Sequence, residues 1–118
     1  MTVAGAPRVE RLDGEERTSR LAERLGGQQV TLLLQDPQGR VAVEWRGVVR
    51  DGSTCVRQQV TLRSAGAEAP VRQIVLVDQE WPGAAVCGVV DGSPIVPGNL
   101  FVGFGHPLAR SSTEGNRA

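Results

Sequence analysis

The stretch VAVEWRGVVR, from Val41 to Arg50, decides the fold, because its apolar and charged side chains alternate along the chain. Val43, Trp45 and Gly47 point to one side, whereas the charged residues between them point to the other. Alternation with a period of two is typical of a β-strand that has one apolar and one polar face. The stretch therefore predicts an antiparallel sheet with one solvated side.

The segments on both sides of this stretch continue the pattern. Their apolar residues at alternate positions are Val30, Leu32, Leu34, Val56, Val60 and Leu62. Turn sequences join the three strands, DPQG at 36–39 and DGS at 51–53, and both favour chain reversal. We expect the apolar residues to form one core that contains Trp45, and Arg57 on the polar face to be solvated or to pair with Glu44.

Further strands are expected at 71–77, 85–90 and 100–104, with a loop at 64–70 after the meander. The predicted fold class is all-β, an antiparallel β-sandwich. Residues 1–28 are expected to form either a polar arm or a short helix, capped by Thr18 or Ser19 and running to Leu25, before Gly26 and Gly27. Residues 29–109 are expected to form one antiparallel β domain, and the polar residues 110–118 a disordered tail.

Composition excludes several classes of function. The 13 basic and 13 acidic side chains balance, which argues against a nucleic-acid partner, whose binding depends on positive charge. No apolar run approaches the ~20 residues of a membrane span, and Met1 to Pro7 lacks the features of a signal peptide. Cys55 and Cys87 make neither a disulfide framework nor a metal site. We expect both in the core, with a bridge between them left open.

Three segments together resemble one family of large bacterial proteins, labelled as enterotoxin-like or glycoside-hydrolase-related. The first is similar to a "W…LRDGSNYVRQ" hairpin, the second to "VDGSPVVAGNLFF", and the third to "GFEHPLA". They lie at Trp45–Gln58, Val90–Phe101 and Gly103–Ala109. Two positions depart from the family: Cys55 replaces a usual Tyr, and Gly105 replaces a usual Glu, which removes a carboxylate beside His106.

The resemblance implies a fold and a setting. The family region that carries these motifs is similar to the β-supersandwich that precedes the barrel in α-galactosidase-like enzymes. It implies a partial supersandwich from a secreted or periplasmic protein, with the chain expected to be a fragment of a larger polypeptide. The implied partners are carbohydrate, the remainder of that polypeptide, or another chain paired through open strand edges.

No pair of acidic residues stands out as the acid and nucleophile of a glycosidase. Asp36, Asp51 and Asp91 each sit beside Pro or Gly, where a carboxylate stabilises a turn. The candidate ligand contacts are Trp81, Asn99 and His106, and the last two lie in the resembling segments. No catalytic residue, metal or cofactor is assigned. The sequence favours a non-catalytic β-sandwich portion of a carbohydrate-active protein that supports a neighbouring catalytic domain. The alternative is a stand-alone carbohydrate-binding or protein-interaction module.

Overall fold

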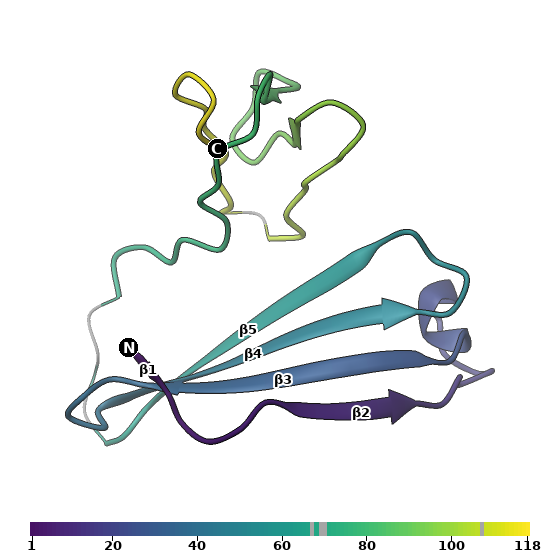
Figure 1. Cartoon of the computed structure of the whole chain (residues 1–118), viewed down its shortest axis with the longest axis vertical. Helices are drawn as coiled ribbons and strands as arrows, with labels where there is room; N and C mark the ends of the chain where they lie inside the picture. The colour runs from purple at the N-terminus through teal and green to yellow at the C-terminus, as the bar shows by residue number, and fades with distance from the viewer. Residues whose placement is uncertain (67, 69–70, 107) are drawn as a thin grey trace. The chain divides into compact units, whose positions relative to one another are not determined.

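A computed structural model describes residues 1–66, 68, 71–106 and 108–118 of the chain (Figure 1). Pro107 of the third resembling segment and parts of the expected loop at 64–70 lie outside the described residues. The fold is all-β and antiparallel, as the sequence predicts. The chain forms two compact units, Met1–Pro70 and Val71–Ala118. This division falls inside the range 29–109 that was expected to form one domain, because each strand ladder stays within one unit.

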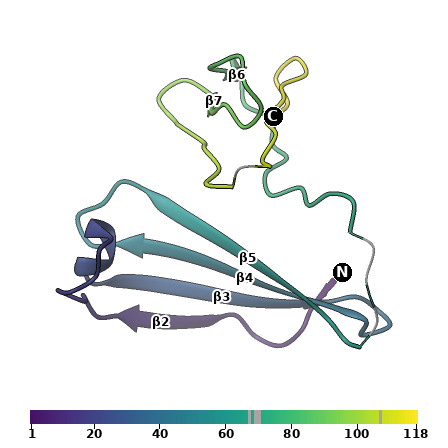
Figure 2. The same ribbon diagram turned by 180° about the vertical axis from the view of Figure 1, so that it is seen from behind.

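The first unit is a five-stranded antiparallel sheet with the order β1-β3-β4-β5, in which β2 also pairs with β3. Its strands are β1 (Thr2–Val3), β2 (Arg8–Leu12), β3 (Gly27–Gln35), β4 (Val41–Arg50) and β5 (Val56–Ser64). The three long strands form a meander in which each strand pairs with the next along the chain. Figure 2 shows the same sheet from behind.

The strand register confirms the alternation read from the sequence. Trp45 lies opposite Leu32 on β3 and opposite Val60 on β5, so all three share one side of the sheet. We call this side the apolar face. Its apolar residues are Val3, Val9, Val30, Leu32, Leu34, Val41, Val43, Trp45, Val49, Val56, Val60 and Leu62.

The apolar face is not a closed core, contrary to expectation. Trp45 and Val43 are only half-buried, and Val49 is 44% exposed. Among the described residues the only buried hydrophobic side chains are Ala84 and Ile95, both in the second unit. Among its described residues, the first unit is one sheet with a single 3-10 turn, so no second layer of the unit covers these apolar side chains. The prediction of which residues share this face is therefore confirmed, and the prediction that they form a buried core is wrong.

The N-terminal segment contributes two strands, where an arm or short helix was expected. β2 pairs with β3 along its whole length, from Arg8 opposite Thr31 to Leu12 opposite Gly27. The helical part is a single 3-10 turn at Leu21–Arg24. A five-residue strand forms here because its backbone groups complete a ladder with a longer neighbour, which local propensity does not reveal.

The second unit has little regular structure. It contains β6 (Ala85–Val86) and β7 (Ile95–Val96), with Val102 bridged to Ile95. The predicted strand at 71–77 is not formed, and those at 85–90 and 100–104 shrink to two residues and one bridge. A strand persists only where a neighbour pairs with its backbone groups, and among the described residues no strand pairs with 71–77.

Disorder was expected for 110–118, but residues 114–118 pair with the chain around 78–83. Gln79 and Ala118 exchange backbone hydrogen bonds of 2.8 and 2.9 Å, and the Trp81 N–H donates to the Asn116 carbonyl at 2.7 Å. Arg117 adds two contacts of 2.6 Å to the Asp78 carboxylate. We call residues 114–118 the C-terminal strap. Its polar composition suggested disorder, but backbone pairing does not depend on apolar side chains.

Both cysteines are free and exposed, so neither the expected burial nor a bridge is found. Cys55 lies in the turn after β4, where its N–H donates to the Ser53 hydroxyl at 3.1 Å. Cys87 follows β6, and its N–H donates to the Pro94 carbonyl at 2.7 Å. The described residues include no helix that is long and apolar enough to cross a bilayer.

Candidate functional site

The three predicted ligand contacts all lie in the second unit. Trp81 is half-buried, and Asn99 and His106 are exposed. In the described part of the chain, no hydrogen bond or ion pair joins any two of them. The structure therefore does not gather them into one polar cluster.

Local contacts explain the position of each of these residues. The backbone of Trp81 is held between the Asn116 carbonyl and the Ala84 N–H, which donates to the Trp81 carbonyl at 3.1 Å. Asn99 occupies a turn closed by the Leu100 N–H and the Pro97 carbonyl at 3.1 Å. The main chain of Trp81 is therefore hydrogen-bonded through both its N–H and its carbonyl. An amphipathic aromatic ring such as its indole suits stacking on a sugar.

His106 stabilises its own loop. Its Nδ1 accepts a hydrogen bond from the Leu108 N–H at 3.2 Å, which leaves Nε2 at an exposed position. Among the described residues, no group of three or more His, Cys, Asp and Glu side chains is placed to hold a metal ion. His106 therefore stabilises the chain locally through Nδ1.

Asp36 stabilises the β3–β4 turn, as the sequence predicts. Its Oδ1 accepts from the Val41 N–H at 3.0 Å, and its Oδ2 lies 3.4 Å from Arg40 Nε. The hydrogen bond from the Val41 backbone is the main reason why the pKa of Asp36 is lowered, with a smaller contribution from Arg40. The carboxylate is therefore ionised at neutral pH and engaged on both oxygens.

Asp51 and Asp91, the other predicted turn residues, also meet arginines. Asp51 receives two hydrogen bonds from Arg11, one of them 3.0 Å long, and the pair raises the pKa of the Arg11 guanidinium. This pair connects β2 to the β4–β5 turn. Asp91 lies 3.5 Å from Arg110, with both side chains largely exposed. Asp51 and Asp91 thus also form ion pairs with arginines that are distant in the sequence, which the sequence did not predict.

Two further carboxylates are paired in the first unit. Glu23 accepts from the Thr18 hydroxyl at 2.9 Å and from Arg20 at 3.1 Å, and these hydrogen bonds lower its pKa, with Thr18 the larger cause. Glu44 forms an ion pair with Arg46 at 2.5 Å. Arg57 was expected to be solvated or to pair with Glu44. It is exposed and lies 4.0 Å from Glu23, whereas the register places Thr61 opposite Glu44 and Val48 opposite Arg57.

Asp78 and Arg117 form a bidentate ion pair in the second unit. Two parallel contacts of 2.6 Å lower the pKa of Asp78, and the hydrogen bonds from Arg117 are the main cause. A bidentate geometry of this kind is among the strong charge-assisted hydrogen bonds. The pair lines an open polar hollow of about 270 Å³ together with Gln79 and Glu80. Its evident role is to hold the C-terminal strap.

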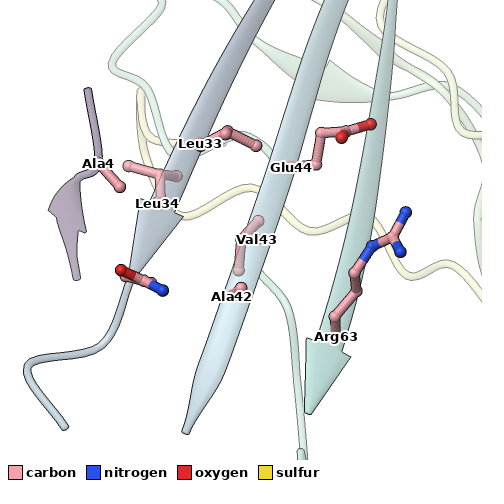
Figure 3. Close-up of a pocket in the computed structure, with 8 residues that line it drawn as sticks. Ala4, Leu33, Leu34, Ala42, Val43, Glu44 and Arg63 are labelled. Atoms are coloured by element: carbon pink, nitrogen blue, oxygen red, sulfur yellow. The ribbon is translucent and has the colours of Figure 1, made fainter. Parts of the chain in front are cut away.

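A smaller hollow of about 130 Å³ lies on the first unit, where β3, β4 and β5 run side by side (Figure 3). Its lining consists of Ala4, Leu33, Leu34, Gln35, Ala42, Val43, Glu44 and Arg63. Leu33 is 50% exposed, and the Glu44 carboxylate already has Arg46 as its partner. The hollow is thus shallow and mostly apolar, with no free carboxylate among its described members.

The apolar face is a surface, whereas its residues were expected from the sequence to form a buried core. Trp45 lies at its centre, and the indole N–H donates to Gln58 Oε1 at 3.0 Å. The indole ring lies over Gly47, whose missing side chain makes room for it. The alternation pattern predicted which residues share this face. It contains no information on whether another part of the chain covers the face or leaves it exposed.

Comparison with known protein families, curated proteins and solved structures gives no match to this chain. The candidate sites therefore depend on geometry alone. That geometry offers one tryptophan with a hydrogen-bonded main chain, several carboxylates engaged by arginine or backbone groups, and one broad apolar sheet face.

Proposed function

We propose that this chain is a non-catalytic β module of a carbohydrate-active bacterial protein, and that it acts by binding and support. The proposal depends on the observation that several carboxylates of the chain are already engaged in hydrogen bonds. Asp36, Asp51 and Asp78 each accept hydrogen bonds from arginine or from backbone N–H groups. Their oxygens are occupied in holding turns and the C-terminal strap.

The direction of the pKa shifts supports the same conclusion. Glycoside hydrolysis uses a carboxylic acid with a raised pKa as proton donor, opposite a second carboxylate. Here the pKa values of Glu23, Asp36 and Asp78 are lowered by their hydrogen bonds. These groups are ionised at neutral pH and are suited to structural pairing rather than to proton donation.

The carbohydrate assignment is tested by calorimetric titration of the full chain with oligosaccharides of several classes. We expect weak binding that Trp81→Ala removes, because Trp81 has a hydrogen-bonded main chain and an aromatic face. Phe101→Ala is the matched control, since Phe101 is a 67% exposed aromatic residue in the same unit. If binding survives Trp81→Ala but is lost in Phe101→Ala, the oligosaccharide contacts Phe101 rather than Trp81.

Catalysis is tested separately with a panel of aryl glycosides. We expect no turnover by the full chain. Hydrolysis that one Asp or Glu substitution abolishes would overturn the non-catalytic assignment, whatever the binding result.

A protein-interaction module is the second candidate, and the apolar face favours it. Val3, Val9 and Val56 are 56%, 65% and 65% exposed on one side of a single sheet. Contiguous apolar surface of this extent is typical of an interaction site.

A further inference from the structure

The chain exposes more surface than two compact units of its size. Its accessible surface is 9250 Å². Folded proteins with the masses of the 70-residue and 48-residue units would expose about 4,200 and 3,200 Å², roughly 7,400 Å² together. The excess of about 1,800 Å² remains even though each unit is counted as separate. Surface on this scale is what association buries.

The apolar face is a large, continuous part of this exposed surface. Its long strands have nine or ten residues, which is about 30 Å of strand length. The three long strands at about 4.8 Å spacing give roughly 430 Å² in projection, and the shorter β1 and β2 beside β3 bring the face to roughly 540 Å². Two such faces in contact bury more than about 1,000 Å², the size at which a specific interface becomes stable.

Charge separates the two sides of the sheet. The opposite face carries Arg8, Glu10, Glu44, Arg46, Arg50, Arg57 and Arg63, an excess of positive charge. On the apolar face the charged residue is Arg11, which is paired with Asp51. Two copies that meet through the opposite face would bring like charges together, whereas two apolar faces meet without repulsion.

We propose that two copies of this chain pack with their apolar faces together and form a two-layer β-sandwich between chains. Sheets that pack in this way lie about 10 Å apart with strand directions about 30° apart. Trp45, at the centre of the face, then becomes buried between the layers. The proposal goes beyond the proposed function, because it depends on the sheet alone and not on any carbohydrate.

The test compares two adjacent leucines on β3 in the full chain. Leu32 is on the apolar face, and Leu33 is on the opposite face and 50% exposed. We expect sedimentation equilibrium to show a dimer, and Leu32→Arg to raise its dissociation constant by about 100-fold or more, because each interface gains two buried charges. Leu33→Arg should leave the constant within about threefold. A monomeric parent protein, or an equal loss in both variants, would overturn the proposal.

A second measurement keeps the proposal testable if Leu32→Arg fails to fold. In Trp81→Phe, the fluorescence comes from Trp45 alone, since the chain has two tryptophans. Dilution from a concentrated solution should shift the Trp45 emission to longer wavelength at the concentration where the dimer dissociates. Emission that stays red-shifted at every concentration would mean that the face is never covered. Emission that stays blue-shifted in a monomer would mean that cover comes from within the chain. Either result contradicts the proposal.

Discussion

Replacing Gly47 with alanine should displace the Trp45 indole. A Cβ at Gly47 would lie 2.6 Å from Cη2 and 3.2 Å from Cζ3 of Trp45, well inside the ~3.5 Å at which carbon atoms pack favourably. The ring would have to rotate and lose its 3.0 Å hydrogen bond to Gln58, which contributes about 1 kcal/mol. Overpacking of this kind costs about 1–3 kcal/mol, and the better strand propensity of alanine returns about 0.5–1 kcal/mol. We expect a net loss of about 1–3 kcal/mol.

Removing Trp45 should abolish the cost of the Gly47 substitution. Trp45→Ala should itself cost about 2 kcal/mol, less than the ~3–5 kcal/mol of a fully buried tryptophan, because Trp45 is half-buried. In that background Gly47→Ala should be neutral or stabilising by about 0.5 kcal/mol. The two changes should therefore be coupled by roughly 2 kcal/mol.

The assay is urea denaturation followed by far-ultraviolet circular dichroism, at one protein concentration for all variants. Gly105→Ala is the control, because a Cβ there meets no atom of the described residues within 4 Å. If Gly47→Ala costs the same with and without Trp45, the contact between the ring and the glycine does not limit stability, and the reasoning is refuted.

Three further predictions follow from the site geometry. The pKa of Asp78 is lowered by Arg117, so the stabilisation from this pair is present above the ordinary carboxyl pKa of about 4 and is lost as the pH falls through the folded value. At that acidic pH, hydrogen exchange of the amides at 116–118 should accelerate, and Asp78→Asn should accelerate it at neutral pH. Unchanged exchange would mean that the ion pair does not hold the C-terminal strap. Asp36→Ala should lower the denaturation midpoint and speed hydrogen exchange of the Val41 amide, which donates a hydrogen bond to Asp36. If the Val41 amide stays protected from exchange, Asp36 does not stabilise this turn. Cys55 and Cys87 are exposed, so both should react with a thiol reagent in native protein, whereas reaction only after denaturation would contradict their exposure.

The meander could be predicted because its signals are local. Val43, Trp45 and the charges between them alternate within ten residues, and the register confirms that alternation. Asp36 could be assigned to its turn for the same reason. Burial could not be predicted, because it depends on whether another layer lies over the face, and period-two alternation contains no information on that point.

The features that were missed depend on partners far away in the sequence. Arg117 and Asp78 are 39 residues apart, and Arg11 and Asp51 are 40 apart, so no local pattern links them. The strap itself pairs through backbone groups, which composition does not encode. Trp81, Asn99 and His106 remain predictions as ligand contacts, since the structure places each one without testing what it binds.

The meander also bears on how the first unit folds. β3, β4 and β5 are joined by connections of five residues, from Gln35 to Val41 and from Arg50 to Val56. Contacts between neighbours along the chain close quickly, and hairpins form in about 1–10 μs. β2 must instead close a longer loop before it reaches β3, which raises its entropic cost. We therefore expect substitutions at Asp36 to slow folding and substitutions at Arg11 to speed unfolding, so that the two ends of one sheet have separate kinetic roles.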